Sequence, residues 1–592
     1  MHLWLWAVLP TLLLAGCNEK DAQLAHDSLL YCTATSPLSF NPQLVVATDT
    51  LDATAHQLYD RLLALDSRSQ EPLPALASDW QRSADGLRYR FHLQPNVAFH
   101  NTDWFSPTRT LNASDVVFSF TRLTDPQNPY HKVSGGRYPF FSAINWPQLV
   151  KQVREIDEQQ VEFVLNYPDA DFLQYLASDY AVILSAEYAT QLQAANTPQL
   201  LDQQPIGTGP FLLDFYRPDE FIRYHRHPDY WQAESRVSHL VFDITPKSSK
   251  RLAKLLTGEC DAMANPAASQ LAVIQRHPDL ALSAAAGIST AVLAFNTQKP
   301  PFNDLRVRNA IRLAIQKENI VQAVYFGEAT LAEHLLPEPV LPPILWSQAT
   351  QPQASDNAAT EGLITNSLIS DGLAIAPAIM DNPAAESSNT DSSNTDSPGS
   401  TPFDRQSDRE QNVAEARRLL AEAGLSGGFK MTLLMPAGAR TYNPDGLKTG
   451  QLFQQQLAPL GIKLTLRALD EQILLNQLLS GQQDAVLIGW SADIPSPDNM
   501  LRNLLSCRAI KAGTNASRWC HPAFEAELNL ALIDAEPARR QAYYQAAQYL
   551  AELDVALIPL VHSQRRLSYR RSVSGLQLLP YGGVNFQLVE KE

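Results

Sequence analysis

The chain has 592 residues, which is too long for a single hydrophobic core and predicts at least two lobes. Apolar residues make up 45% of it, an ordinary share for a folded protein. The 46 Lys and Arg residues against 62 Asp and Glu residues give a formal net charge of -16. A nucleic-acid-binding protein needs a basic surface, so the balance disfavours nucleic acid as a partner and is compatible with cationic solutes.

The N-terminus has the pattern of an export signal. Leu3 to Leu14 is apolar, with a length that suits a signal peptide and is short for a membrane span. It ends in Leu14-Ala15-Gly16-Cys17, which resembles a bacterial lipobox, so we expect residues 1–16 to be removed and Cys17 to be acylated. Residues 17–27 would then be a tether, without a membrane-spanning helix in the mature chain. The n-region lacks Lys and Arg, and a soluble periplasmic protein is the alternative.

Export would place the other cysteines in an oxidising compartment, where their even number favours disulfides. Three pairings are open to Cys32, Cys260, Cys507 and Cys520. A Cys507–Cys520 bridge closes a short polar loop, worth roughly 3 kcal/mol in the chain-entropy model, and leaves Cys32 to pair with Cys260. A zinc site with His521 beside Cys520 is the competing interpretation, but the chain has no CxxC pair.

In the first half of the chain, hydrophobic spacing predicts a few elements clearly. We expect a strand at Ser28–Thr33, a helix over Asp52–Leu65 and an alternating strand at Tyr89–Leu93. Asn112 or Ser114 would cap the helix that follows them.

Turn and cap residues mark the middle of the chain. Gly207-Thr208-Gly209-Pro210 predicts a turn whose glycine backbone can approach a ligand closely, although a plain hairpin or crossover explains it as well. Asp304 would begin the amphipathic helix that contains Val307, Ala310 and Ile311.

Residues 347–403 differ in kind from the rest of the chain. They hold seven acidic residues and no Lys or Arg, and they include the tandem Ser387–Asp391 and Ser392–Asp396. Such a composition buries too little apolar surface to offset chain entropy, which predicts a disordered acidic insertion.

After the insertion the pattern alternates between helix and strand. The expected pairs are Ala414–Ala423 with Phe429–Met435, Gly446–Leu457 with Ile462–Arg467, and Glu471–Leu479 with Ala485–Trp490. Alternation of this kind predicts a mostly parallel, covered sheet. A long helix at Pro537–Leu553 and a strand at Ala556–Val561 follow.

The stretch Asp484–Asp493 has the pattern of a buried strand that ends at a ligand site. The segment Ile494–Asp498 cannot continue a strand, because its prolines have no N–H to donate. Trp490 and Asp493 should therefore lie at a strand end, where ligands bind in α/β folds. An aromatic face beside a carboxylate suits a ligand with an apolar body and a cationic end. The alternative is an edge Trp packed on a helix and a solvated Asp.

Several segments recur in the order and spacing of a known family. They are Leu73–Trp80, Tyr89–Leu93, Ala113–Phe120, Pro205–Phe211 and Pro301–Ala310. This set resembles the periplasmic dipeptide- and oligopeptide-binding proteins of ABC importers. The SapA branch is the most similar, on Asp103–Phe105, Leu255–Asp261, Leu504–Cys507 and Trp519-Cys520. The resemblance covers about residues 28 to 585.

The resemblance implies an α/β fold of the two-lobed periplasmic binding protein type (type II, cluster C) with an extra third domain. The implied boundaries are 28–65, 206–295 and 562–592 for a discontinuous lobe I, 66–205 for domain II and 296–561 for lobe III. Hinges would lie near Phe295 and His562.

The resemblance also assigns roles within the site. A peptide would lie extended between the lobes and add to strand edges by main-chain bonds. Asp493 would hold its α-ammonium group, and Trp490, Ser491 and Ala492 would border its backbone. Asp498 is the rival carboxylate, and Asp493 is preferred because it lies nearer the strand end.

The predicted function is a monomeric periplasmic receptor that delivers peptides, including cationic antimicrobial ones, to an inner-membrane ABC permease. Haem or polyamine handling within the same branch is an alternative, as is a secreted hydrolase or chaperone-like binder. Gly424–Gly428 matches GxSxG by letters but follows a helix and precedes a strand, the reverse of a nucleophile elbow. With no P-loop and no HExxH, we expect neither an enzyme nor a metal or cofactor site.

Overall fold

The computed structural model describes residues 27–285, 288–338, 340 and 402–592. By its internal contacts the chain forms two units, residues 1–341 with 413–592, and residues 342–412. The predicted signal peptide, Cys17 and residues 347–401 of the predicted insertion lie outside the described residues. Among the described helices, none combines the length and apolarity that a membrane crossing requires.

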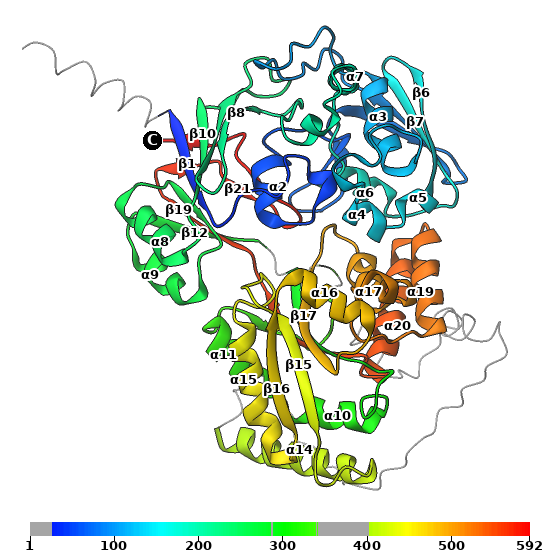
Figure 1. The fold of residues 1–592 in the computed structure, drawn as a ribbon, viewed down its shortest axis with the longest axis vertical. Helices are drawn as coiled ribbons and strands as arrows, with labels where there is room; N and C mark the ends of the chain where they lie inside the picture. Colours follow the sequence, from blue (N-terminus) through cyan, green and yellow to red (C-terminus); the bar gives the residue numbers. More distant parts are fainter. Residues whose placement is uncertain (1–26, 286–287, 339, 341–401) are drawn as a thin grey trace, which may run out of the picture. The chain divides into compact units, whose positions relative to one another are not determined.

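A seven-stranded sheet has the N-terminal strand at its centre (Figure 1). Its order is β12-β19-β11-β1-β10-β9-β8, and β1 is parallel to both of its neighbours. The strands are β1 Ser28–Thr33, β8 Phe211–Arg217, β9 Phe221–Arg226, β10 His239–Ile244, β11 Ala262–Ala264, β12 Leu280–Ala284 and β19 Arg566–Arg570. Helices α8 Ser248–Thr257 and α9 Leu271–Arg276 accompany them. The Cys32–Cys260 disulfide joins β1 to the segment that precedes β11.

A second, antiparallel sheet of four strands has the order β4-β5-β7-β6. Its strands are β4 Ala77–Arg82, β5 Arg88–Leu93, β6 Val150–Asp157 and β7 Gln160–Leu165. The helices around it are α3 Ala113–Thr124, α4 Pro139–Ala143, α5 Trp146–Leu149, α6 Phe172–Ala177 and α7 Ala186–Ala194. One continuous core of buried side chains links this sheet to the seven-stranded one, so we call residues 27–285 and 564–592 together lobe A.

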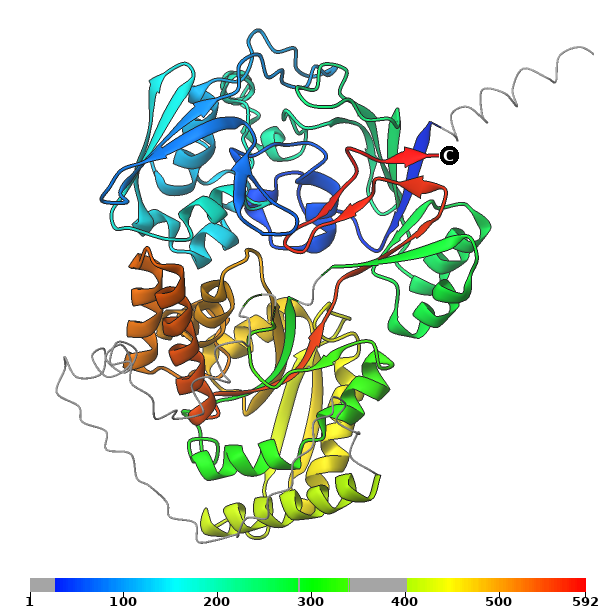
Figure 2. The ribbon, with the colours of Figure 1, turned by 180° about the vertical axis from the view of Figure 1, so that it is seen from behind.

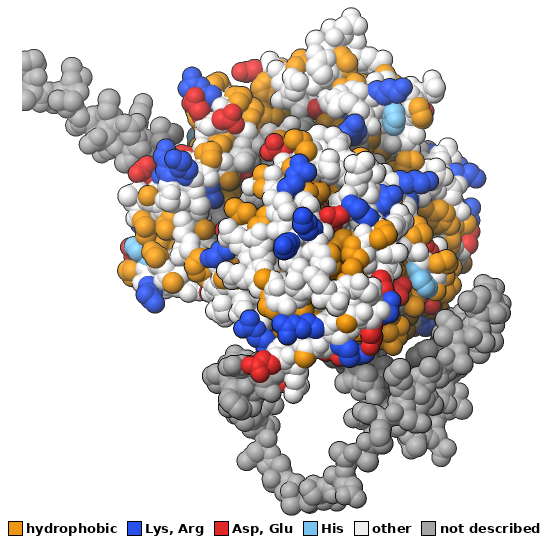
Figure 3. Space-filling model, turned by 60° about the horizontal axis from the view of Figure 1, so that its bottom comes forward, with side chains coloured by type: hydrophobic (Ala, Val, Ile, Leu, Met, Phe, Trp, Pro, Cys, Tyr) orange, Lys and Arg blue, Asp and Glu red, His pale blue; other side chains and the backbone are white. Residues whose placement is uncertain are grey.

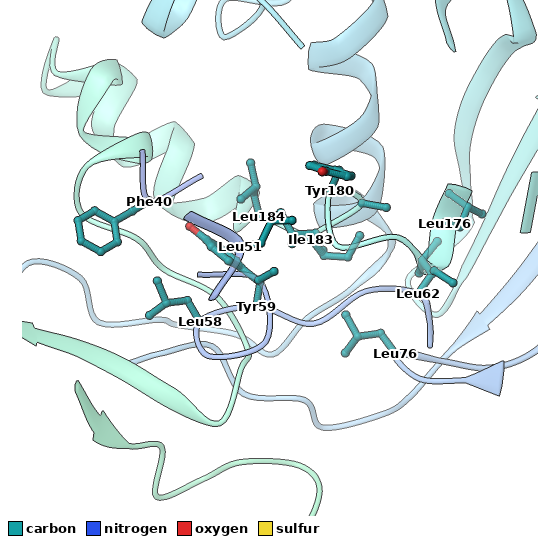
Figure 4. Close-up of a cluster of buried hydrophobic side chains, with 14 of the residues drawn as sticks. Phe40, Leu51, Leu58, Tyr59, Leu62, Leu76, Leu176, Tyr180, Ile183 and Leu184 are labelled. Carbon is teal, nitrogen blue, oxygen red and sulfur yellow. The ribbon is translucent and has the colours of Figure 1, made fainter. Parts of the chain in front are cut away.

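The predicted helix over Asp52–Leu65 is wrong in its extent. Helix α2 spans Thr48–Thr54, and Leu63–Leu65 forms strand β2, which pairs with β3 at Pro72–Pro74. Leu58 and Leu62 are buried as their spacing indicated, but as part of an irregular segment (Figure 4). Tertiary bonds replace the helical ones: the carbonyl of Leu58 accepts from Gly209 N, and that of Leu62 accepts from Ala77 N.

The Gly207–Pro210 turn packs against this same segment. A Cβ on Gly207 would lie 1.9 Å from the carbonyl oxygen of Leu58, and one on Gly209 would lie 2.5 Å from the Leu58 carbonyl carbon. Both glycines are therefore required by a close backbone approach within lobe A.

A six-stranded sheet has the order β14-β18-β13-β17-β15-β16. Its strands are β13 Ser289–Phe295, β14 Thr330–Leu331, β15 Lys430–Pro436, β16 Lys463–Leu469, β17 Ala485–Ser491 and β18 Leu557–Ser563. The three strands of the helix–strand pairs are parallel, as predicted. The prediction of a mostly parallel sheet is wrong for the whole, because β13 and β18 carry the chain to and from lobe A and pair antiparallel.

Alternate residues of these strands face two separate cores. Leu487 lies with helices α10 Leu305–Ala314, α11 Lys317–Tyr325, α14 Pro402–Glu422 and α15 Gly446–Leu457. Val486 lies with α16 Glu471–Ser480, α17 Pro497–Leu505, α19 Pro522–Ile533 and α20 Pro537–Leu553 (Figures 1 and 2). We call residues 288–338, 340 and 402–563 lobe B. Strand β13, which the implied boundary at residue 295 would put in lobe I, belongs to this sheet.

Local signals in the sequence are confirmed where they concern caps. Asn112 caps α3 and Asp304 caps α10 through their side chains. Gly424 follows α14 with a φ of +77°, so the GxSxG letters lie at a helix end. Besides short 3-10 helices, the remaining elements of the described residues are α18 Cys507–Ala512, β20 Val573–Ser574, β21 Gln577–Leu578, β22 Val584–Asn585 and β23 Glu590–Lys591.

Candidate functional site

The candidate residues come together at the carboxyl end of β17, an inner strand of the six-stranded sheet. Strand β17 pairs with β13 up to Ser491, which lies opposite Ser289. Ala492 N still donates to Ile288 O at 3.1 Å, and a loop then leads to α17, which Ser496 caps. Asp493 therefore lies on the first residues that leave the sheet, as predicted.

Gly489 allows a close approach just before Trp490. A Cβ at this position would lie 2.4 Å from both the carbonyl oxygen of Thr290 and the ring of Tyr442. Tyr442 also lines a small cavity with Arg440 and Asn443 at the carboxyl end of β15. Arg440 is partly exposed there, and its carboxylate partner Glu471 is 86% exposed.

Asn499, on the first turns of α17, fixes the geometry of the site. Its Oδ1 accepts from Trp490 Nε1 at 3.1 Å and from the Asp493 backbone N–H at 3.0 Å. Its Nδ2 donates to Asp493 Oδ2 at 3.5 Å. Asn499 is 4% exposed, so one buried amide orients both the indole and the carboxylate. Nothing in the local sequence pattern marks this residue.

Tyr180 brings lobe A to the site. Its hydroxyl donates to Asp493 Oδ1 at 2.9 Å across 313 residues of sequence. The tyrosine is 2% exposed, and its ring stacks on Phe140 with centroids 4.5 Å apart. Figure 4 shows it on the same segment as Ile183 and Leu184. No sequence pattern points to Tyr180, because only the tertiary fold brings it to Asp493.

The Asp493 carboxylate is short of positive charge. Burial raises its pKa from the ordinary value to about 6, although the hydrogen bonds from Tyr180 and Asn499 act in the opposite direction. None of the described basic residues forms an ion pair with it. The residue as a whole is partly exposed.

Asp498, the rival carboxylate, lies in a different environment. Its oxygens accept from Arg502 Nε at 2.8 Å and Nη2 at 2.9 Å, one helical turn further along α17. Asp498 is 7% exposed and is neutralised by this bidentate pair.

The remaining candidates line the same strand end. Trp490 is half-buried, and Ala492 is buried among the side chains on the α16–α20 face of the sheet. The Ser491 hydroxyl lies 2.6 Å from that of Ser289. Each candidate therefore has a neighbour within lobe B that holds it in place.

The cysteines form disulfides rather than a zinc site. Cys507 is joined to Cys520 and Cys32 to Cys260. The proposed zinc ligand Cys520 is thus consumed, and the described residues contain no group of three or more His, Cys, Asp or Glu side chains placed to hold a metal ion.

Comparison with known proteins gives consistent matches. A profile of the bacterial extracellular solute-binding proteins, family 5 (middle), matches residues 71–512. The peptide transport periplasmic protein SapA of Salmonella typhimurium is 36% identical over 575 residues, 97% of this chain and 94% of that protein. The haem-binding protein A of Haemophilus influenzae is 34% identical, over 97% of this chain and 96% of that protein.

A solved structure extends the match to the fold. The dipeptide-binding protein from a Pseudoalteromonas species, in complex with Met-Leu, is 35% identical with a TM-score of 0.78. The match covers 95% of this chain and all of that one.

Fold and matches together define a type II periplasmic solute-binding protein, and not an enzyme. The chain belongs to the bacterial extracellular solute-binding proteins of family 5, within which the SapA branch is supported.

Proposed function

We propose that the protein captures peptides by their α-ammonium group and that Asp493 is the residue that holds it. The observation that carries the proposal is that the carboxylate of Asp493 accepts hydrogen bonds only from the Tyr180 hydroxyl and the Asn499 amide, with no cation from the described protein beside it. A buried carboxylate of this kind is stabilised by a cation from outside.

The peptide backbone would lie along the end of β17. Trp490, Ser491 and Ala492 would border it. Strand β17 is paired with β15 only at Ala485 and Val486, so its β15 side beyond Val486 would take the main-chain bonds, which ignore side-chain identity. A peptide ligand agrees with the relatives, which include a peptide transport protein and a dipeptide-binding protein solved with Met-Leu. Asp498 is the weaker candidate for the ammonium group, because Arg502 already neutralises it.

The loaded protein would deliver its peptide to an ABC permease of the inner membrane as a monomer. Acylation of Cys17 would hold the protein at a membrane. An ordinary secretory signal, cleaved without acylation of Cys17, would leave the protein soluble in the periplasm. The mass of the mature N-terminus, isolated from membranes, distinguishes the two: a diacyl or triacyl Cys17 supports the anchor, and an unmodified N-terminus overturns it.

Charge does not identify the preferred peptide. Although the net charge is -16, Lys and Arg side chains are spread over the face that Figure 3 shows. Cationic antimicrobial peptides, haem and polyamines are therefore separate outcomes of a binding assay. Native mass spectrometry of the purified protein, before and after refolding without ligand, would show which class co-purifies.

The direct test compares a free dipeptide with its N-acetylated form. We expect refolded protein to bind Met-Leu in isothermal titration calorimetry and to bind N-acetyl-Met-Leu at least 100-fold more weakly. D493N should lose affinity to a similar extent, whereas D79N, a carboxylate change in the four-stranded sheet that leaves the site intact, should bind normally. Equal affinity of D493N and the unmodified protein would refute the assignment.

A further inference from the structure

The loop that follows Asp493 does more than present that carboxylate. Its next residue, Ile494, is 1% exposed and packs into the core of lobe A, although it belongs to lobe B by sequence. Two residues further, Ser496 is 1% exposed and its hydroxyl donates to Asp171 Oδ2 of lobe A. The loop therefore packs into lobe A through the apolar contact of Ile494 and the adjacent hydrogen bond of Ser496.

Asp171 is the centre of this polar contact. Its side chain is completely buried at the start of α6, where it makes no cap bond to its own helix. Its other oxygen accepts from Arg540 of α20, which also donates from Nε to Ala531 O at 3.2 Å. Next to it, Ala170 N donates to Leu532 O at 2.8 Å, a backbone bond from lobe A to lobe B.

The two charged groups in this contact, Asp171 of lobe A and Arg540 of lobe B, neutralise each other. Asp171 has Arg540 as its ionic partner, so the buried carboxylate is neutralised only while the two lobes are in contact. Separation would expose Ile494 and Asp171 and would leave Arg540 without its partner. None of the groups involved is part of the proposed peptide site at Trp490 and Asp493.

We propose that Asp171, Ser496 and Arg540, together with Ile494, form a latch that holds lobe B against lobe A without a ligand and sets how fast a bound ligand leaves. The ligand-affinity part of this inference rests on the proposed function, whereas the lobe contact does not. The affinity of a two-state receptor scales with the fraction of the molecule already in the binding conformation. A latch that stabilises the closed form therefore raises affinity without touching the ligand.

The chain offers a matched control for the latch. Arg539, the preceding residue of α20, forms an ion pair with Asp534 at 2.8 Å within lobe B. R540A and R539A remove the same side chain from adjacent positions, but only R540A removes a contact between lobes. D171N provides a second latch variant of nearly unchanged volume.

The ligand-free proteins are compared first, by small-angle X-ray scattering after refolding and dialysis. We expect R540A and D171N to have a larger radius of gyration than the unmodified protein, and R539A to match it. The far-ultraviolet circular dichroism of each variant shows that it is folded. Folded R540A and D171N with an unchanged radius of gyration would overturn the latch.

Ligand is then added to distinguish a separation of the two lobes from misfolding of the variants. Saturating Met-Leu should return both latch variants to the radius of the unmodified protein, and its dissociation rate should be about tenfold faster than in R539A. An unchanged dissociation rate would overturn the kinetic part. If the unmodified protein does not bind Met-Leu, the proposed peptide function fails, while the ligand-free scattering still decides the latch.

Discussion

Asp493 and Asp171 are two carboxylates at the boundary between the same two lobes, and the protein treats them differently. Asp171 is completely buried and is paired with Arg540 and Ser496. Asp493 is partly exposed and receives only neutral donors, from Tyr180 and Asn499. Both carboxylates accept a hydrogen bond from the other lobe: Asp171 from the cation Arg540, and Asp493 from the neutral hydroxyl of Tyr180.

The partners of a carboxylate distinguish a structural group from a binding one. A buried carboxylate with an arginine is stable when the protein is empty, because its charge is already balanced. A carboxylate held only by neutral donors has no such balance, and it gains stability when a cation arrives. Asp498 with Arg502 belongs to the first kind, although it is only five residues from Asp493.

The largest loss of stability should come from removing the arginine that neutralises a buried carboxylate. R502A leaves Asp498 buried without a partner, and breaking such a pair costs about 3–5 kcal/mol of unfolding free energy. Urea unfolding at pH 7.5 measures it. The double variant R502A/D498N should recover most of the loss, and a loss below about 1 kcal/mol would show that the pair is not needed.

D493N should change stability in the opposite direction. The pKa of Asp493 is about 6 in the folded protein and about 3.9 in an unfolded chain, so the ionised group opposes folding above pH 6. The neutral amide should stabilise the ligand-free protein by roughly 1–3 kcal/mol at pH 7.5, and the gain should vanish below about pH 4. Urea unfolding at pH 7.5 and below about pH 4 measures the difference in unfolding free energy. If D493N is less stable than the unmodified protein at pH 7.5, Asp493 has a cationic partner that this description lacks.

Ligand affinity should fall with acid in the way that the same pKa requires. The empty site must lose its proton before it binds an ammonium group, so the affinity for Met-Leu should drop about tenfold per pH unit below pH 6 and stay constant from pH 7 to 8. Calorimetry between pH 5 and 8 measures this. The residual binding of D493N should lack the slope, and a flat profile for the unmodified protein would exclude Asp493 as the binding carboxylate.

The smallest expected effects concern the neutral donors. Y180F removes one hydrogen bond to the Asp493 carboxylate, worth about 1 kcal/mol, and should weaken Met-Leu about three- to tenfold. N499A removes the other one, together with the bonds that Asn499 accepts from the Asp493 backbone and the Trp490 indole, and should weaken Met-Leu at least as much. Both should also move the midpoint of the acid profile to higher pH, because these bonds lower the pKa of Asp493. Y59F is the control, since Tyr59 is buried within lobe A and its hydroxyl makes no bond to the site. A weakened affinity with an unmoved midpoint would show that Tyr180 acts only through packing.

Much of lobe B could be predicted from the sequence, because its signals are local. The helices Gly446–Leu457 and Pro537–Leu553 begin and end where periodicity and proline place them. The parallel arrangement of β15, β16 and β17 follows from their alternation with helices. The strands β13 and β18 were outside that reasoning, since their pairing depends on where the chain leaves and re-enters lobe B.

The Asp52–Leu65 segment shows the opposite case. Leu58 and Leu62 have helical spacing and are buried, yet their backbone carbonyls bond to Gly209 and Ala77, which are distant in sequence. Helical periodicity reports which side chains are buried and does not decide which backbone groups pair, when a distant segment competes for them.

The family and the strand end that carries Trp490 and Asp493 could be derived from the sequence alone, because both depend on runs of neighbouring residues. The partners of the two carboxylates, Asp493 and Asp171, could not be predicted from the sequence. Tyr180 reaches Asp493 from 313 residues away, and Arg540 reaches Asp171 from 369 residues away. Only the tertiary structure decides which buried charge receives a partner, since that choice depends on the approach of side chains that no local pattern connects.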